Sequence, residues 1–349
     1  MAKKDQLLHF PFQSYDPVIR FFEEAAADEQ VEEIWASLYR VASKSAITQA
    51  LIAARKAGKK VTVFVEVKAR FDEASNLYWA SQMEEAGVKV LYSMPGLKVH
   101  AKIAMVVRRE GENRVRYCYL GTGNFNEKTA RVYVDEAILT ADKRLTAEIN
   151  KVFQFLNGKR KNPKFEHLLV APFNMRKQFN ALIEQEIAEA KAGRKAEMTL
   201  KMNSLEDEKI IARLYKASQA GVNIRIVVRG ICRLVPGIPG QSENIQVTSI
   251  VDRFLEHARV YLFHNAGKPV MYLASADWMK RNLSRRIEVA FPIYNRTLFR
   301  EMKRMLDIQL RDNTKARVID AQHSNAYVKS RRKKTRAQYA SYELLGGQV

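Results

Sequence analysis

The chain has 349 residues, of which 47% are hydrophobic, and this is enough for two domains that each bury a core. Lys and Arg number 59 against 38 Asp and Glu, so the net charge of +21 predicts an anionic partner: nucleic acid, an acidic membrane surface or a phosphate-rich substrate. Two cysteines and the lack of a long apolar run argue against a disulfide framework, a zinc cluster or a transmembrane helix, so we expect a soluble cytoplasmic protein.

The first half of the chain predicts alternating strands and helices. The stretch SLYRVASKSAITQALIAARKAG (37–58) ends in a helix, and the β-branched strand KKVTVFVEV (59–67) follows it. LKVHAKIAMVV (97–107) is typical of a buried strand, and YLGTGNFN (119–126) of a strand with a small-residue turn. The apolar spacing of AEINKVFQFL (147–156) predicts a closing helix.

The second half repeats this order. LKMNSLEDEKIIARLYKASQAG (200–221) aligns without gaps with 37–58, and the strand VNIRIVVRG (222–230) follows. FLEHARVYLFH (254–264) corresponds to 97–107, and YLASADWMKRN (272–282) corresponds to the GTGN turn and its strand. The sequence therefore predicts an α/β protein of two similar domains, each a mixed sheet flanked by helices, packed around a central cleft.

The cluster NGKRKNPK (157–164) marks the boundary between the two predicted domains. We expect residues 1–160 to form the first domain and 161–328 the second. Residues 329–349, which include KSRRKKTR, are expected to form a basic, disordered tail.

Each half carries one histidine in a His-x-basic pair within a predicted strand. His100 and Lys102 lie two residues apart and therefore point to the same face, as do His257 and Arg259. A single pair of this kind is typical of a solvated edge strand, but two copies at matching places favour one functional centre. One imidazole would attack as a nucleophile and the other would assist the leaving group; the residues alone leave open which does which.

Several arginines follow the carboxyl ends of predicted strands, where α/β proteins bind ligands. Arg40, Arg70 and Arg229 hold such positions, and they predict a phosphate cage because guanidinium groups bind phosphate bidentately. Lys68, Arg281 and Arg286 are plausible additions, although a surface salt bridge is an equally ordinary role for Lys68. Asn124 ends the loop GTGN (121–124), whose backbone N–H groups could face an anion.

Acidic and aromatic side chains occur in the same neighbourhoods. Carboxylates there could orient a histidine or an arginine, or meet a magnesium ion, although many are expected to be structural ion-pair partners; they are Glu66, Asp72, Glu73, Asp135, Asp277 and Glu288. Tyr133 and Trp278 lie near the predicted loops and could stack on a base, although a core position is more typical of Trp278. The histidines His9, His167, His264 and His323 have no such context.

The double His-x-Lys/Arg layout followed by GTGN resembles the phospholipase D superfamily. That motif continues with an Asp, and here its positions hold Val107 and His264, which argues against an ordinary phosphodiesterase. Longer stretches such as VEVKARFDEASN, GLKVHAK, LGTGNFNEKTA, IVVRGICRLVPGIPGQSENI and SADWMKRNL resemble the two carboxyl-terminal catalytic domains of bacterial polyphosphate kinase. The resemblance extends from about Pro11 to Asp312 and implies two phospholipase D-like domains.

The resemblance implies reversible transfer of the terminal phosphoryl group of ATP to polyphosphate, with Mg²⁺ and a phosphohistidine intermediate. It identifies His100 as the phosphorylated residue and His257 as a second essential histidine, with Lys102 and Arg259 beside them. Further residues are then expected to contact nucleotide, phosphate or metal: Arg40 and Arg70 for phosphate and Mg²⁺, Tyr133 and Arg229 for the nucleotide, Asn124, Lys68 and Arg286 for phosphate, and Glu288 for the metal.

Inorganic polyphosphate and adenine nucleotide are the expected partners, with no specific nucleic acid; peripheral membrane association and an oligomer remain open. Proteins of this family are about twice as long and carry an amino-terminal and a head domain. Two alternatives therefore stand beside the kinase: a catalytically impaired polyanion-binding module and a phospholipase D-like phosphodiesterase.

Overall fold

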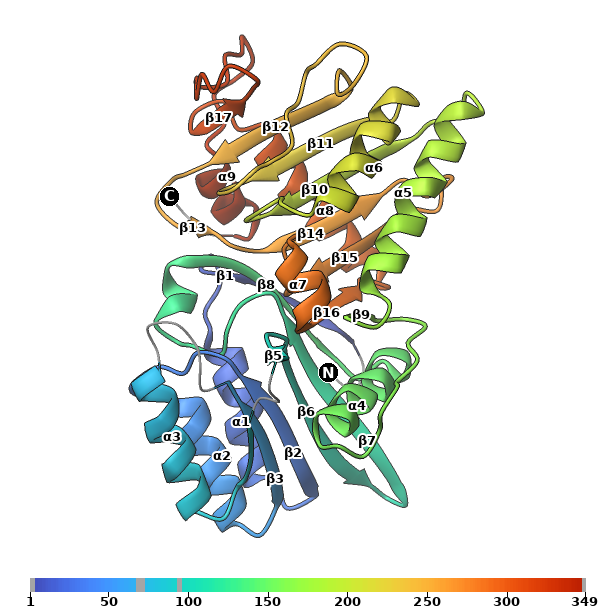
Figure 1. The fold of residues 1–349 in the computed structure, drawn as a ribbon. Coiled ribbons are helices and arrows are strands. Elements are labelled where there is room, and N and C mark those ends of the chain that lie inside the picture. The colour runs from blue at the N-terminus through green and yellow to red at the C-terminus, as the bar shows by residue number, and fades with distance from the viewer. Residues whose placement is uncertain (1–3, 67–72, 93–95, 347–349) are drawn as a thin grey trace.

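The computed structural model describes residues 4–66, 73–92 and 96–346. The fold is α/β, with two mixed sheets, each flanked by helices, and the two halves lie one above the other (Figure 1). The internal repeat is also a repeat of topology. In each half three parallel strands are followed by three antiparallel ones.

The first sheet has the strand order β1-β8-β7-β6-β2-β3-β4. Its strands are β1 (Gln6–Phe10), β2 (Val31–Leu38), β3 (Lys60–Val65), β4 (Lys89–Tyr92), β6 (Lys102–Glu110), β7 (Asn113–Gly121) and β8 (Tyr133–Thr140). The helices of this half are α1 (Asp16–Ala27), α2 (Ala46–Lys56), α3 (Glu73–Glu85) and α4 (Lys143–Leu156), with a 3₁₀ turn over Thr129–Arg131.

The second sheet has the strand order β17-β12-β11-β10-β14-β15-β16-β5. The strands from this half are β9 (Leu169–Ala171), β10 (Glu197–Met202), β11 (Asn223–Val228), β12 (Ile245–Ile250), β14 (Arg259–Phe263), β15 (Val270–Ala274), β16 (Arg286–Pro292) and β17 (Ala316–Ile319). The helices are α5 (Met175–Lys191), α6 (Glu208–Gln219), α7 (Lys280–Arg285), α8 (Arg296–Leu310) and α9 (Ala337–Leu344).

Equivalent helices in the two halves begin at equivalent caps. Ser45 accepts a hydrogen bond from the backbone N–H of Thr48 and starts α2, and Asp207 accepts one from Ile210 and starts α6. Each of these helices follows the first parallel strand of its half and turns an apolar face to the sheet. The chain therefore returns to the same sheet edge in both halves, and the loops after β2 and β10 lie at equivalent places.

One apolar core joins the two halves. It combines side chains of β6, β7 and α4 with side chains of β14, β15, β16 and α8, and examples are Ile103, Phe153, Leu273 and Met302, each at most 2% exposed. Because the removal of apolar surface from water drives packing, this shared core fixes the two sheets against each other. A segment placed at their junction is consequently held from both sides.

His9, to which the sequence assigned no role, also joins the halves. It is fully buried on β1, its Nδ1 contacts Glu136 of β8, and its Nε2 lies 3.0 Å from Glu301 of α8. Burial alone would lower the pKa of His9, but the two carboxylates outweigh it and raise this pKa to about 9. The imidazolium thus ties the two halves together by charge.

The structure corrects the prediction of one continuous strand over 97–107. The chain forms β5 (Lys98–Val99), leaves it at His100, and starts β6 at Lys102. β5 pairs with β16 of the second sheet, whereas β6 pairs with β2 and β7 of the first. The second half does the reverse: β13 (Leu255–Glu256) pairs with β8 of the first sheet.

The prediction of a disordered tail over 329–349 is wrong for the residues that form α9. Arg336, just before this helix, bonds Asp252 at 2.6 and 2.8 Å. Gln338 then donates to the backbone of Phe254 and to Glu256. The charge run hid this helix, because its few anchoring residues do not form an apolar pattern. No helix in the described part of the chain is long and apolar enough to cross a membrane.

Candidate active site

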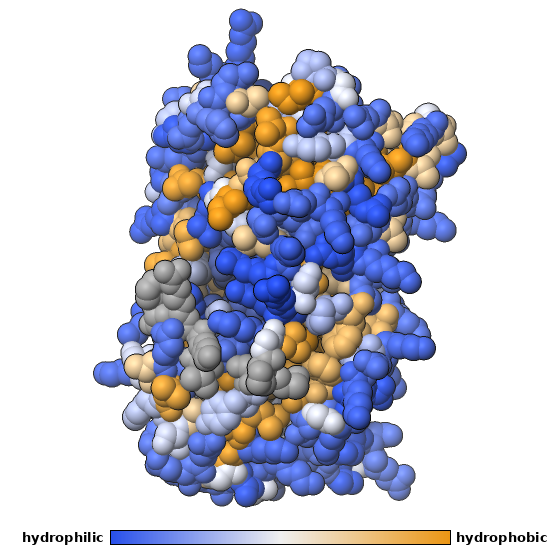
Figure 2. All heavy atoms as spheres, in the orientation of Figure 1, coloured by the Kyte–Doolittle hydropathy of each residue, from blue (hydrophilic) through white to orange (hydrophobic). Residues whose placement is uncertain are grey.

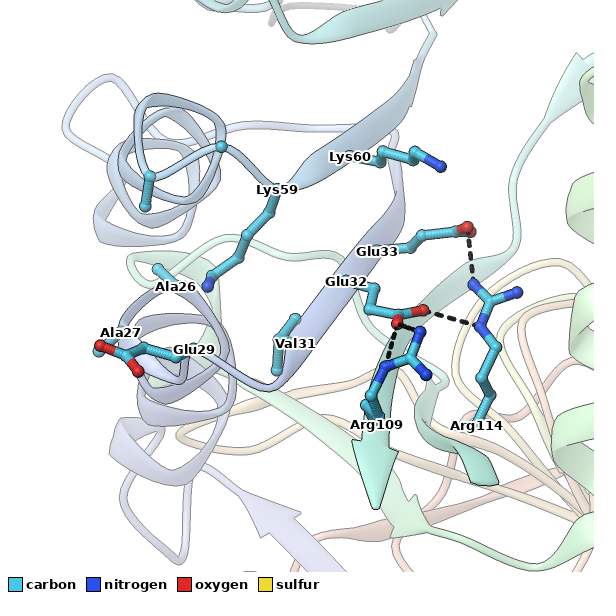
Figure 3. Close-up of a pocket in the computed structure, with 12 residues that line it drawn as sticks. Ala26, Ala27, Glu29, Val31, Glu32, Glu33, Lys59, Lys60, Arg109 and Arg114 are labelled. Carbon is cyan, nitrogen blue, oxygen red and sulfur yellow. Dashed lines mark hydrogen bonds and ion pairs between the residues drawn. The ribbon is translucent and has the colours of Figure 1, made fainter. Parts of the chain in front are cut away.

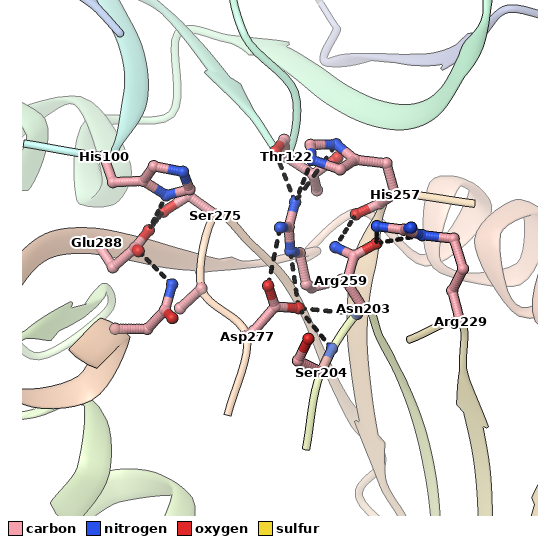
Figure 4. A network of polar contacts seen from close by, with 12 residues as sticks. His100, Thr122, Asn203, Ser204, Arg229, His257, Arg259, Ser275, Asp277 and Glu288 are labelled. Carbon is pink, nitrogen blue, oxygen red and sulfur yellow. Dashed lines mark hydrogen bonds and ion pairs between the residues drawn. The ribbon is translucent and has the colours of Figure 1, made fainter. Parts of the chain in front are cut away.

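β5 and β13 each pair with the sheet of the opposite half and are called the exchanged strands below. They place both histidines at the junction of the two sheets (Figure 4). The N–H groups of His100 and Ala101 both donate to the carbonyl of Ile287, at 2.9 Å. In the same way, the N–H groups of His257 and Ala258 donate to the carbonyl of Val134, at 3.1 and 2.7 Å. Each histidine is therefore anchored to the sheet of the opposite half.

Glu288 orients His100 from the opposite half. Nδ1 of His100 lies 2.9 Å from Oε2 of Glu288. Ser275 donates to the same carboxylate, and Asn282 donates to its other oxygen at 2.6 Å. Since three donors converge on this carboxylate, it keeps Nδ1 of His100 protonated and leaves Nε2 with a lone pair. No described residue forms a hydrogen bond to that Nε2.

Asp135 does the same for His257. Both of its carboxylate oxygens lie 2.9 Å from Nδ1, and Thr122 donates to Oδ1 at 2.6 Å. Gly123 leaves room for the Asp135 side chain, because a Cβ at position 123 would lie only 2.2 Å from its carboxylate.

Sequence reasoning missed Thr122, Ser275 and Asn282. The repeat holds a signal for Thr122 and Ser275. Each lies 13 residues before the carboxylate that it bonds, Asp135 for Thr122 and Glu288 for Ser275. The GTGN loop therefore supports Asp135 through Thr122 and Gly123, and its predicted role toward an anion stays a prediction. The N–H of Thr122 is bonded to Glu136, and it is not turned to an anion.

The two basic side chains differ in how they are held. Arg259 is clamped by Asp277 at 3.0 and 3.2 Å, and its Nη1 lies 3.2 Å from Nε2 of His257. Lys102 is 1% exposed, bonds the carbonyl of His100 and lies 4.9 Å from the ring centre of Tyr39. Nη1 of Arg259 is nearly as close to Nδ1 of His257, at 3.4 Å, so the guanidinium lies against the imidazole ring of His257.

Burial controls the protonation of this centre. It lowers the pKa of His100 well below the ordinary value, and the charges of Lys102 and Arg286 act in the same direction. Burial also lowers the pKa of His257, against the opposing effect of Asp135. Both imidazoles are therefore neutral near pH 7. Burial raises the pKa of Glu288 to about 7, although Lys102 opposes the shift.

A buried group of polar side chains, called the polar brace below, supports the segment that carries His257. Lys201 and Glu256 form an ion pair of 2.6 Å and are both 2–3% exposed. Arg229 donates to the carbonyl of Glu256 at 2.7 Å and to Asn203 at 3.0 Å. Arg229 therefore supports the histidine segment, and burial lowers its pKa. The structure places it within reach of the centre, as the sequence predicted, but its donors are already partly used.

The remaining predicted residues lie at various distances from this centre. The Tyr133 ring is 5.1 Å from that of His257, and Nη1 of Arg286 is 3.9 Å from Glu288. Oδ1 of Asn124 is buried and has no hydrogen-bond partner in the described part of the chain. Arg40 follows the carboxyl end of β2 by two residues.

Three other predicted positions that the structure describes do not join the centre. Arg281 is exposed on α7, Glu73 is exposed at the start of α3, and Trp278 is a core residue stacked on Tyr261. Lys68, Arg70 and Asp72 lie outside the described residues. Glu66 is buried and accepts a hydrogen bond from the N–H of Val99, so it braces β5.

The described side chains do not fit a resident magnesium ion. Hard cations need several carboxylate or carbonyl oxygens, and no cluster of three acidic, His or Cys side chains suited to a metal occurs among the residues described. Glu288, predicted as a weak metal ligand, already accepts from His100, Ser275 and Asn282. Its carboxylate is therefore better described as a positioning group for His100.

A large surface depression of about 830 Å³ lies elsewhere, at the amino ends of β2 and β3 (Figure 3). Its charges neutralise one another: Arg109 and Arg114 pair with Glu32, and Arg114 also pairs with Glu33. It contains no histidine, so it lacks the nucleophile that the junction offers. Figure 2 shows hydrophilic side chains gathered across the middle of the molecule, between the two halves.

Family models and known relatives match almost the whole chain. Residues 1–162 match the model "Polyphosphate kinase C-terminal domain 1", and residues 168–338 match "Polyphosphate kinase C-terminal domain 2". The chain belongs to the polyphosphate kinase family. The polyphosphate kinase of Vibrio parahaemolyticus is 49% identical over 343 residues, and that of Escherichia coli K12 is 46% identical over 346.

The chain spans about half the length of the polyphosphate kinases that it matches: 98% of this chain aligns with 49% of the Vibrio protein, and 99% with 50% of the Escherichia one. The crystal structure of polyphosphate kinase from Porphyromonas gingivalis superposes with a TM-score of 0.92 and 48% identity, over 99% of this chain and 53% of that one. Phosphatidylserine synthase of Haemophilus influenzae, at 10% identity and a TM-score of 0.61, shares the fold, with 91% of this chain and 88% of that one covered.

Proposed function

We propose that this chain is the catalytic region of a polyphosphate kinase, which moves the terminal phosphoryl group of ATP to inorganic polyphosphate and back. The observation that carries the proposal is the state of His100. This imidazole is neutral, oriented through Nδ1 by Glu288, and free of hydrogen bonds from described residues at Nε2. Such an arrangement is that of an activated nucleophile.

In the proposed first step, Nε2 of His100 attacks the γ-phosphorus of ATP. An N–P bond forms, the bond from the γ-phosphorus to the bridging oxygen breaks, and ADP leaves with the electron pair. The phosphorylated ring gains positive charge, which the Glu288 carboxylate stabilises across the 2.9 Å contact. In the second step, a terminal oxygen of polyphosphate attacks the same phosphorus; an O–P bond forms, the N–P bond breaks, and its electron pair returns to Nε2, which restores neutral His100.

The surrounding cations suit the charge that moves in both steps. Phosphoryl transfer depends mainly on positioning and charge neutralisation, and Arg259 and Arg286 supply positive charge at the junction, whereas burial lowers the pKa of the Lys102 ammonium well below its ordinary value. His257 lies beside Arg259 and would donate a hydrogen bond or a proton to the leaving oxygen once it has taken up a second proton at Nε2, which Asp135 favours against the effect of burial. Magnesium would enter bound to the nucleotide phosphates, as part of the substrate, since the described side chains do not hold it.

Isotope exchange tests this proposal. If the phosphohistidine forms, labelled ADP should exchange into ATP in the presence of magnesium and without polyphosphate, because the first step is reversible by itself. The matched variant His100→Gln should show no exchange. Polyphosphate binding without any exchange would instead support a polyanion-binding module, and release of phosphate from a generic phosphodiester would support a phosphodiesterase.

A further inference from the structure

The segment 329–334, called the basic loop below, carries five cations in six residues: Lys329, Arg331, Arg332, Lys333 and Lys334. All six residues are exposed. The segment follows β17 and leads into α9, within the dark red part of the chain in Figure 1. A charge run of this kind is most often a solvated tail, so its structure decides whether it is more than that.

The basic loop is anchored just before its start, at Val328, and around its end, at Lys333 and Thr335. The N–H of Val328 donates to the carbonyl of Ala316 at 2.9 Å. Asn313 donates to the carbonyl of Lys333 at 3.1 Å and accepts from the N–H of Thr335 at 2.7 Å. These bonds use main-chain atoms of Lys333 and of the two flanking residues, so they leave the cationic side chains of the loop exposed on the surface.

The side chains of the basic loop also have no acidic partner in the part of the chain that the structure describes. Exposed arginines elsewhere on this protein are commonly paired, as Arg144 is with Asp142 and Arg194 is with Glu189. No carboxylate among the described residues forms an ion pair with any cation of the basic loop. Since like charges held together repel one another, an unneutralised cluster on an ordered surface favours an anionic ligand.

A short chain of contacts connects the basic loop to the catalytic junction. Arg336 forms its bonds to Asp252, and Gln338 bonds both the N–H and the carbonyl of Phe254, at 2.9 and 2.8 Å. Gln338 also donates to Glu256 at 2.9 Å, and the next residue is His257. The basic loop and the His257 segment therefore belong to one connected structure.

We propose that the basic loop is a second polyphosphate-binding site, which holds an internal part of the chain while the chain end reacts at His100. This inference rests on the proposed function. The ligand is assigned by chemistry: the loop offers only cations and a serine, with no apolar side chain to enter a membrane. Arg317 covers one face of the nearby Tyr327 ring at 3.9 Å, which leaves only the other face for stacking on a base.

Such a site would act by tethering. A chain bound at the basic loop keeps its end at a high effective concentration near the junction, so several transfers occur before it dissociates. The benefit requires a polymer long enough to reach both sites. Tripolyphosphate occupies only the reaction centre, so the rate of its use should not depend on the basic loop.

Two triple variants of the protein test the proposal. The first is Arg331→Gln/Arg332→Gln/Lys333→Gln. The matched control is Lys159→Gln/Arg160→Gln/Lys161→Gln, a cluster that is also exposed and lies in the connection between the halves. Each set removes three charges, from +21 to +18, so unspecific attraction changes equally. The measurements are Kd for long-chain polyphosphate against salt, product length, and ADP–ATP exchange.

We expect the loop variant to bind long-chain polyphosphate about tenfold more weakly, with a salt slope reduced by about 2, and to release shorter products. The control variant should stay within twofold of the wild type, and exchange and tripolyphosphate use should be unchanged in both. Equal weakening of both variants, or of neither, would overturn the site. So would a loop variant that loses binding to anionic vesicles or RNA but keeps polyphosphate. Loss of exchange in the wild type would count against the proposed function instead.

Discussion

Glu288 offers the sharpest test of how the exchanged strands make His100 reactive. Its carboxylate accepts from His100 and Ser275 on one oxygen and from Asn282 on the other. In Glu288→Gln, the new NH₂ group must face either Asn282 or His100, so one donor loses its acceptor. If it faces His100, the ring protonates at Nε2 and loses its nucleophilic lone pair.

The expected loss follows from the bond that is removed. A hydrogen bond to a charged group contributes about 1.5–3 kcal/mol, and at about 1.4 kcal/mol per tenfold this predicts phosphohistidine formation slowed roughly 10- to 150-fold. The pH profile adds a second signature. The pKa of Glu288 is raised to about 7, so wild-type labelling should fall as the pH drops through 7 and Glu288 takes up a proton.

Single-turnover labelling with γ-labelled ATP, followed from pH 5.5 to 9, measures both effects. Labelling of Glu288→Gln should be slow, and its rate should not fall as the pH drops through 7. Asp135→Asn is the matched control, because it alters the equivalent carboxylate on His257, and contacts with His257 and Thr122 keep the pKa of Asp135 low. The labelling rate of Asp135→Asn should still fall as the pH drops through 7. A folded Glu288→Gln protein with the wild-type rate and profile would refute the reasoning.

Three further predictions concern the groups that support the centre. Glu256→Ala leaves the Lys201 ammonium buried and unpaired, so the free energy of unfolding should fall by about 3–5 kcal/mol in urea denaturation, whereas an unchanged midpoint would contradict the polar brace. The pKa of His9 is raised to about 9 in the folded state, so its contribution of about 3 kcal/mol should be complete below pH 6.5 and lost as the pH rises through 9. His9→Asn should remove that pH dependence from thermal unfolding curves, and a variant that keeps it would place its origin elsewhere. Gly123→Ala puts a Cβ 2.2 Å from the Asp135 carboxylate, so polyphosphate synthesis should slow tenfold or more; a normal rate would show that Asp135 moves without cost.

The repeat made much of the fold predictable. Gapless alignment of 37–58 with 200–221 predicts equivalent strands and helices, and the structure has α2 and α6 at those places with equivalent caps. The His-x-basic pairs pointed to His100 and His257 because they recur at matching places of the repeat, although both histidines lie between two strands and not within one.

The cross-domain partners could not be predicted in this way. β5 and β13 are two residues each, and their pairing with the opposite sheet depends on how the halves pack, which no local pattern records. The sequence named Asp135 and Glu288 among six possible carboxylates but gave no reason to assign Glu288 to His100. His9 was missed because its acidic partners lie on β8 and α8, far from it in sequence.

Acid-labile phosphate incorporation from γ-labelled ATP with magnesium, measured in the wild type, His100→Ala and His257→Ala, shows which histidine is phosphorylated. The geometry of the exchanged strands assigns His100 as the nucleophile and His257 as the assisting group. It predicts labelling of the wild type, slower labelling of His257→Ala, and none of His100→Ala. Labelled phosphate that persists in His100→Ala, or that is recovered on His257, would contradict the account.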